Sequence, residues 1–295
     1  MRKFDLDVAI LGAGTAGLAA YREARKYTDR LAVFDGGELG TTCARVGCMP
    51  SKLLIAAAEA LHRAQHVGQF GLSCGETSVD GAAVMERVRS ERDRFVGFVL
   101  ESIDEFDAAH VVREHVRFVD NHTLETTGGR QVTARAIVIA TGSRPAIPPP
   151  FEAAADRLIT NDHVFDWDTL PASVAVFGAG VIGLELGQAL HRLGVRTALF
   201  GRDNFVGPLS DPAVRDYAGK TFASEFTAHW HSDTTISREG DQVVVERGGD
   251  SPSTERFDYL LAATGRRANV DDLGLENTDL ELDPRGVPLY DPLSM

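Results

Sequence analysis

Short, largely apolar runs of four or five residues recur along the chain, and glycine or a polar residue follows each one. Such runs are typical of strands buried in a parallel sheet. Stretches of helical character separate the early members of each half. The runs lie at 8–11, 31–34, 136–140, 173–177, 196–200 and 259–263. This alternation of strand and helix predicts an α/β fold.

Two further patterns lie between and after these runs. Apolar residues recur at helical spacing from Val84 to Phe106, which predicts a long amphipathic helix whose apolar face packs on the core. A partner-binding helix is the alternative. Residues 242–246 and 257–259 flank the glycine-containing segment 248–250, which predicts a hairpin.

The first apolar run enters a glycine motif, Gly12-Ala-Gly14-Thr-Ala-Gly17, and a helical stretch follows. The first glycine permits a tight turn, the second lets the backbone approach a pyrophosphate, and the third allows the helix to pack closely on the strand. The next strand ends at Asp35, whose carboxylate can accept hydrogen bonds from a ribose diol. The order predicts a dinucleotide site.

A second copy of the motif begins 166 residues later and contains Gly178, Gly180 and Gly183. Each copy is followed by a strand that closes in Ala-Thr-Gly, so the repetition predicts two Rossmann-like domains. The proline-rich segment 145–150 is the natural crossing between them, and the return falls near Arg267. We therefore expect a FAD-binding domain over 1–147, a nicotinamide-binding domain over 148–267, and a return into the first domain over 268–295.

Two cysteines, Cys43 and Cys48, follow the first motif five positions apart. On an ideal helix their Cα atoms would be about 8.6 Å apart, beyond the limit of about 7 Å for a disulfide. Gly47 and Pro50 supply the distortion that a disulfide requires. Strong helix formers follow from Ser51, so Cys48 should lie near a helix N-terminus, where the dipole favours a thiolate. The alternative is two cysteines that pack as small hydrophobic residues.

With both glycine motifs and the segment from Cys43 to Lys52, the chain resembles the flavin-dependent pyridine nucleotide-disulfide oxidoreductases, and the cysteine motif is most similar to that of dihydrolipoamide dehydrogenases. The resemblance implies that FAD binds the first motif and NAD or NADP the second. It implies that Cys43 attacks the substrate, that Cys48 faces the flavin, and that Lys52 near the flavin pairs with Glu185 in a dry site.

The resemblance implies a set of site residues. The catalytic ones are Cys43, Cys48, Lys52 and Glu185. The cofactor-binding ones are Gly12, Gly14, Gly17, Asp35, Thr42, Lys52, Val116, Thr141, Gly142, Ser143, Gly178, Gly180, Val181, Ile182, Gly183, Glu185, Arg202 and Gly265. No metal ligand is implied.

The chain departs from the family pattern at its carboxyl end. Family members continue into an interface domain that forms a homodimer and carries a His-Glu pair as catalytic base, and we expect that domain to be absent here. The histidines of this chain do not match that motif, so none is nominated as the base. We expect a fragment of a longer enzyme or a defective member.

The choice of nicotinamide nucleotide stays open at this point. NAD-using members carry an acid where Gly201 follows the strand 196–200, whereas Arg202 could meet the 2′-phosphate of NADP. Against NADP, Pro208 stands where a second arginine is found, Asp203 adds repulsion, and Gly183 is typical of NAD sites. The lipoamide resemblance favours NAD.

Composition limits the class of protein. A net charge of −13 excludes a typical nucleic-acid binder. No apolar run reaches about 18 residues and no signal peptide precedes the first strand, so we expect a cytoplasmic protein without a membrane partner. Three cysteines in 295 residues exclude a disulfide-stapled secreted domain. Cys74 has no motif around it.

Three functions remain as alternatives. The first is an oxidoreductase that takes a small or lipoyl-protein dithiol as substrate. The second is a glutathione- or mercuric-reductase-like enzyme on the same scaffold, although glutathione reductases often have two lysines where this chain has Ser51 and Lys52. The third is a nucleotide-binding module without catalysis.

Overall fold

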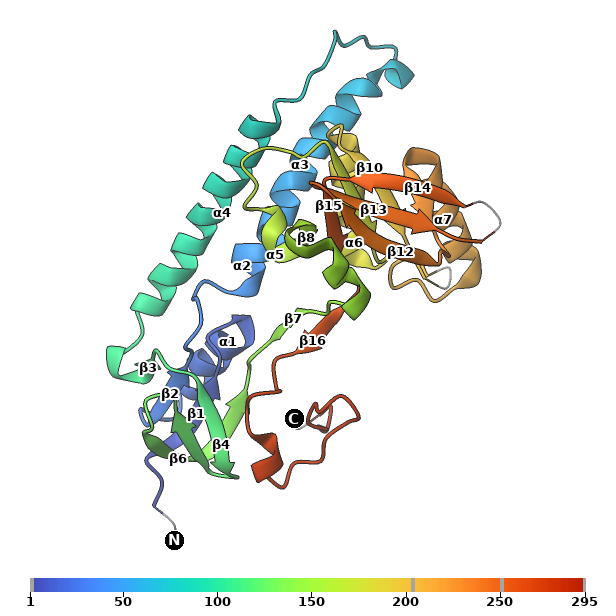
Figure 1. Cartoon of the computed structure of the whole chain (residues 1–295). Coiled ribbons are helices and arrows are strands. Elements are labelled where there is room, and N and C mark those ends of the chain that lie inside the picture. The colour runs from blue at the N-terminus through green and yellow to red at the C-terminus, as the bar shows by residue number, and fades with distance from the viewer. Residues whose placement is uncertain (1–2, 203–204, 250–251, 294–295) are drawn as a thin grey trace. The chain divides into compact units, whose positions relative to one another are not determined.

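The computed structural model describes residues 3–202, 205–249 and 252–293. The chain divides into two compact units (Figure 1). Unit 1 takes residues from 1–44, 95–144 and 267–295, and unit 2 from 45–94 and 145–266. The chain leaves unit 1 through β7 (Ser143–Pro145) and returns through β16 (Arg266–Ala268). Residues 45–94, which the sequence assigned to the first domain, cluster with unit 2.

Unit 1 is built on a six-stranded sheet of order β3-β2-β1-β6-β5-β4. The strands are β1 (Leu6–Leu11), β2 (Leu31–Phe34), β3 (Val111–Val112), β4 (Val116–Asp120), β5 (Thr123–Thr126) and β6 (Gln131–Ile139). β1 pairs in parallel with β2 and β6, while β4, β5 and β6 pair antiparallel. The four strands β3-β2-β1-β6 place the first glycine motif at the carboxyl end of the central strand.

Two apolar clusters cover the two faces of this sheet. One lies under α1 (Thr15–Ala24) and contains Ile10, Leu18 and Val33. The other contains Leu11, Phe118 and segments that return near the carboxyl end, such as Val270 and Leu273. Because both faces are buried, β2 is apolar along its whole length.

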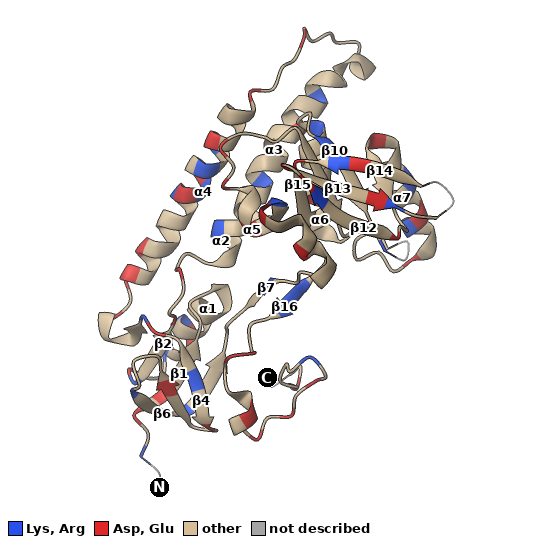
Figure 2. Ribbon diagram, viewed as in Figure 1, with Lys and Arg blue, Asp and Glu red and all other residues tan. Residues whose placement is uncertain are grey.

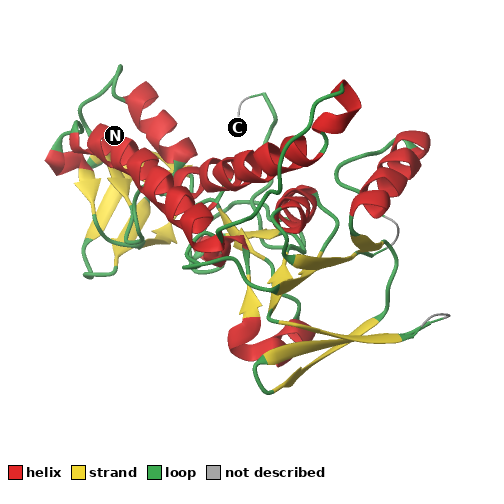
Figure 3. Ribbon diagram, turned by 90° about the horizontal axis from the view of Figure 1, so that it is seen from above, coloured by secondary structure: helices red, strands yellow, loops and turns green. Residues whose placement is uncertain are grey.

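Unit 2 is built on a five-stranded parallel sheet of order β11-β10-β9-β15-β8. Its strands are β8 (Leu158–Ile159), β9 (Ser173–Phe177), β10 (Arg196–Phe200), β11 (Thr227–His229) and β15 (Tyr259–Ala262). A meander of β12 (Thr234–Glu239), β13 (Gln242–Arg247) and β14 (Ser253–Phe257) covers one face, and helices cover the other (Figure 3). The predicted hairpin is found in part: β13 pairs antiparallel with β14, but the second strand is 253–257 rather than 257–259, and Tyr259 already belongs to β15 of the parallel sheet.

The remaining helices fall into two groups. The α-helices are α2 (Thr42–Val46), α3 (Cys48–Gln65), α4 (Gly81–Asp104), α5 (Asn161–Val164), α6 (Val181–Arg192) and α7 (Pro212–Glu225). The 3₁₀ helices are η1 (Val67–Phe70), η2 (Ala108–His110), η3 (Pro149–Arg157) and η4 (Leu275–Asn277). Helix α4 confirms the predicted amphipathic helix, since Met85 and Val88 are fully buried while acidic and basic residues stand along its length (Figure 2). The predicted α/β architecture is confirmed.

Candidate functional site: two glycine turns and a cysteine segment

The first glycine turn has the geometry of a phosphate cradle. Gly12 has φ +106°, and a side chain there would lie 2.5 Å from the carbonyl oxygen of Ala140. A side chain at Gly17 would collide with the Gly12 carbonyl, so α1 packs directly on the turn. Gly14 caps α1 without a side-chain hydrogen bond and has no heavy atom within 4 Å of an added Cβ. The space above Gly14 and the first amides of α1 therefore suit a pyrophosphate.

Asp35 lies directly after β2 and ties this turn together. Its carboxylate accepts hydrogen bonds from the amide of Ala13 at 2.6 Å and from that of Gly37 at 2.8 Å. These bonds hold the carboxylate beside the turn, at the carboxyl edge of the sheet, where a ribose diol can donate to it.

Apart from Lys52, the other residues predicted for FAD lie in unit 1 at three places. Thr42 begins α2, Val116 is buried at the start of β4, and residues 141–143 follow β6. Asn269 was missed by the sequence reasoning. Its side chain donates to the Thr141 carbonyl at 3.0 Å and its amide donates to the Gly142 carbonyl at 3.0 Å. A bracing contact across so many residues leaves no local sequence signal.

The residues of unit 1 fit the dinucleotide part of FAD. The cradle is open at Gly14, where no heavy atom lies within 4 Å of an added Cβ, and the Asp35 carboxylate stands at the end of the second strand. Gly12, Gly14, Asp35 and the amides of α1 are the groups that would hold it.

The second glycine turn repeats the first. Gly178 has φ +110°, and a side chain there would collide with the Ala263 carbonyl. A side chain at Gly183 would collide with the Gly178 carbonyl, whereas nothing lies within 4 Å of an added Cβ at Gly180. Unit 2 therefore fits a second dinucleotide at the start of α6.

The surroundings of the second turn place the remaining predicted residues. Val181 is half exposed and Ile182 half-buried in the first turn of α6. Gly265 follows β15 with φ +110°. Arg202 is exposed beyond the end of β10. Asp203, which the sequence set against an NADP site, lies outside the described residues.

The cysteine segment contains the expected break. Helix α2 ends at Val46, Gly47 has φ −127° and ψ −118°, and α3 begins at Cys48. The predicted helix start at Cys48 is therefore confirmed. Cys43 is half-buried and Cys48 is exposed. Ser51, buried one turn later, donates from its hydroxyl to the Cys48 carbonyl at 3.1 Å and reinforces the first turn of α3.

Lys52 and Glu185 meet in unit 2, although 133 residues separate them in the sequence. Lys52 lies one turn into α3, Glu185 lies one turn into α6, and Lys52 Nζ donates to Glu185 Oε1 at 2.7 Å. Their side chains are 59% and 35% exposed, so the pair is not buried as the family resemblance implied. The contact links the cysteine helix to the helix of the second glycine turn.

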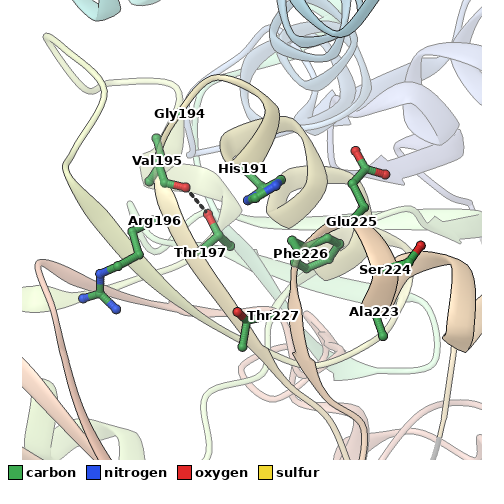
Figure 4. A pocket seen from close by; sticks show the side chains of 10 residues that line it. All are labelled: His191, Gly194, Val195, Arg196, Thr197, Ala223, Ser224, Glu225, Phe226 and Thr227. Carbon is green, nitrogen blue, oxygen red and sulfur yellow. Dashed lines mark hydrogen bonds between the residues drawn. The ribbon is translucent and has the colours of Figure 1, made fainter. Parts of the chain in front are cut away.

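One cavity of about 500 Å³ lies at the opposite edge of the unit 2 sheet. It is formed where α6 and α7 end and β10 and β11 begin, and His191, Phe226 and Thr227 line it (Figure 4). Thr197 in its wall donates to the Val195 carbonyl at 3.0 Å. The nucleotide edge lies at the other end of these strands. Within the described ranges, no helix is both long and apolar enough to cross a membrane.

Comparison with known proteins agrees with this geometry. The chain is 30% identical to a dihydrolipoyl dehydrogenase of Chlamydia muridarum over 95% of its own length and 61% of that protein. It is also 30% identical to a glutathione reductase of Burkholderia cepacia, over 100% of this chain and 65% of the relative, and to a mercuric reductase of Shigella flexneri, over 97% and 52%. The chain thus spans less than two thirds of these relatives.

A solved structure has the same fold. The HOCl-induced flavoprotein disulfide reductase RclA from Escherichia coli superposes with a TM-score of 0.78 at 21% identity, covering 97% of this chain and 62% of that one. The family model for pyridine nucleotide-disulphide oxidoreductases matches residues 6–293. Members of this family use FAD and NAD(P)H, which are the two dinucleotides that the glycine turns fit. The chain belongs to the pyridine nucleotide-disulfide oxidoreductase family.

Proposed function

We propose that this chain carries the electron-transfer part of a disulfide oxidoreductase of the dihydrolipoamide dehydrogenase type. One observation carries the proposal. The helix that begins at Cys48 presents Lys52 one turn later, and Lys52 pairs with Glu185 on the helix of the second glycine turn. A dithiol segment and a nucleotide turn are thus joined by the two residues that the family resemblance assigns to the flavin.

The proposed roles follow from the chemistry of thiols. Cys43 exchanges with a substrate dithiol, so that the Cys43–Cys48 disulfide opens, the substrate becomes a disulfide, and two electrons and two protons reach the cysteines. Bound FAD supplies the two-electron exchange between the cysteines and the nicotinamide. Lys52 and Glu185 would hold charge beside the flavin, and the amides at the two glycine turns would hold the phosphates.

An absorption spectrum tests this proposal. The purified chain should be yellow, and a dithiol should produce the long-wavelength band of a thiolate next to oxidised flavin. Cys48→Ser should abolish that band, while Cys74→Ser, the matched control, should leave it unchanged. A Cys48→Ser protein that retains the band would refute the assignment. Colourless protein that binds a nicotinamide dinucleotide would support the non-catalytic module instead.

The substrate is the finer part of the proposal. The cysteine segment with its Ser51-Lys52 ending supports a lipoyl dithiol, whereas the equal identities to glutathione and mercuric reductases keep those substrates as the second candidate. We expect turnover with dihydrolipoamide to exceed that with glutathione disulfide and with mercuric ion. The opposite order would assign the second candidate. The homodimer expected from the family stays a prediction.

A further inference from the structure

The break between the two cysteine-bearing helices must be kept for the cysteines to join. Helix α2 ends at Val46 and α3 begins at Cys48. In an uninterrupted helix the Val46 carbonyl would accept from the amide of residue 50, but Pro50 has no amide hydrogen, so this carbonyl needs a donor from elsewhere. An uninterrupted helix would hold the two Cα atoms about 8.6 Å apart, which is too far for a disulfide. A donor to the Val46 carbonyl therefore stabilises the break that Pro50 imposes.

The donor to the Val46 carbonyl is the side chain of Asn161. This residue is 6% exposed, and its Nδ2 donates to the Val46 carbonyl at 2.9 Å, a contact within unit 2. The same nitrogen donates to Asp162 Oδ1 at 2.8 Å. Both partners accept only, so the amide nitrogen with its two hydrogens is the end of the side chain that serves them. Aspartate has no such donor, and serine is too short to reach both acceptors.

The helix that carries Asn161 is itself fixed. Thr160 caps α5 by accepting from the Asp162 amide at 3.3 Å, and the Thr160 amide donates to His163 Nδ1 at 3.1 Å. Val164, fully buried, belongs to the same apolar cluster as Leu54 of α3. Asn161 is thus anchored to the core on which the cysteine helix rests.

We propose that Asn161 is a positioning residue that fixes the break between Cys43 and Cys48 and thereby favours their disulfide. This inference rests on the proposed function, in which the two thiols join. Each oxidation releases two electrons and two protons from the thiols to a reference disulfide, which becomes a dithiol. A break that is already held in place makes it easier for the Cys43–Cys48 disulfide to close. Loss of the Asn161 bond therefore shifts the equilibrium toward the reduced cysteines.

Thiol–disulfide equilibration tests the inference without reference to activity. The parent carries Cys74→Ser, so that the remaining cysteines are the two in question. Parent and variants are equilibrated in buffers of reduced and oxidised dithiothreitol, alkylated, and weighed by mass spectrometry. We expect Asn161→Asp and Asn161→Ser to lower the constant for disulfide formation about tenfold, which corresponds to about 30 mV for a two-electron couple.

A matched control is available in unit 1. Asn277 Nδ2 donates to the Phe118 carbonyl at 3.0 Å, the same kind of bond away from the cysteines, so Asn277→Ala should leave the constant unchanged. Asn161→Ser adds no charge beside Asp162 and keeps the test decisive if Asn161→Asp does not fold. A variant constant equal to that of the parent would overturn the role of Asn161. A parent in which the cysteines never join would overturn the proposed function instead.

Discussion

In unit 1 the strand after the glycine-turn helix is followed by Asp35, whereas in unit 2 the corresponding strand is followed by Gly201. Asp35 and Gly201 are equivalent because each follows the residue whose carbonyl accepts from the first glycine of the turn. The Gly12 amide donates to the Phe34 carbonyl at 2.8 Å, and the Gly178 amide donates to the Phe200 carbonyl at 2.9 Å. The turns match in backbone, yet among the described residues a carboxylate completes the first turn and none is seen at the second.

The difference has a steric cause. An added Cβ at Gly201 would lie 2.9 Å from the Trp230 carbonyl, so that position disfavours an acidic side chain. The Asp35 carboxylate is instead tied to the turn by two amides. The two turns therefore share the backbone that suits a phosphate, while the Trp230 carbonyl disfavours at Gly201 the side chain that Asp35 supplies in unit 1.

Substitution of the first glycine in each turn should have the largest effect. Gly12→Ala and Gly178→Ala force a side chain into left-handed backbone and against a carbonyl oxygen. We expect each substitution to weaken binding of the nucleotide at its own turn by about 3 kcal/mol, or roughly a hundredfold in Kd, and to leave binding at the other turn unchanged. Flavin content and titration with nicotinamide nucleotides measure the two sites.

Matched controls separate this clash from the cost of the backbone alone. Gly129 in unit 1 and Gly240 in unit 2 also have positive φ, but nothing lies within 4 Å of an added Cβ. Gly129→Ala and Gly240→Ala should therefore retain both nucleotides. Loss of both nucleotides from a single turn variant would show that the turns do not act separately.

Asp35→Asn should have the next largest effect. The asparagine side chain has one oxygen instead of two, so it cannot accept from the amides of both Ala13 and Gly37 as the Asp35 carboxylate does. It also carries no negative charge to attract the ribose hydroxyls. Because hydrogen bonds to charged groups contribute about 1.5–3 kcal/mol, we expect flavin to dissociate about thirtyfold more readily. Asp29→Asn, an exposed carboxylate in the same unit, serves as control. Unchanged flavin retention would remove Asp35 from the site.

Arg202→Glu should place a carboxylate after β10 in unit 2, as Asp35 places one after β2 in unit 1, although one position farther along the chain. A carboxylate there accepts from ribose hydroxyls and repels a 2′-phosphate, so the ratio of kcat/KM for NAD to that for NADP should rise about tenfold, or about 1.4 kcal/mol. Arg215→Glu on α7 adds the same charge elsewhere and should change the ratio little. If both variants match the wild type, Arg202 is a solvated loop residue.

The smallest expected effect concerns support of the helices. Helix α6 ends in Arg192, which binds Glu59 of α3 and Glu225 of α7, whereas Arg25 just beyond α1 pairs with Asp29 in solvent. Burial raises the pKa of the Glu225 carboxyl, but hydrogen bonds from Arg192 and Gln188 outweigh it and hold that pKa below the usual 4.5. Glu225 therefore contributes stability above pH 4.5 that is lost as the pH falls through its lowered pKa.

Thermal unfolding against pH measures this contribution. Glu225→Gln should be about 1 kcal/mol less stable than wild type at pH 7, and the difference should shrink below pH 4.5. Glu86→Gln, an exposed acid on α4, should have no effect. A difference that persists in acid would mean that packing, and not charge, accounts for the loss.

The sequence predicted what is local and missed what depends on packing. The strand, glycines, helix and Asp35 were predictable because adjacent residues create a phosphate cradle. The pairing of Lys52 with Glu185 followed from the family resemblance, but its exposure did not. The contacts of Asn161 with Val46 and of Gly201 with Trp230 join segments that share no sequence motif. They could therefore not be predicted from the sequence and are seen only in the folded chain.

A methyl group added at Gly14 or Gly180 would meet no other protein atom within 4 Å. Alanine at either position would leave folding almost untouched while standing where a phosphate belongs. A lineage could therefore shed one coenzyme by a single neutral-looking substitution and keep its architecture intact. Surveys that score variants only by thermal melting would pass over the change.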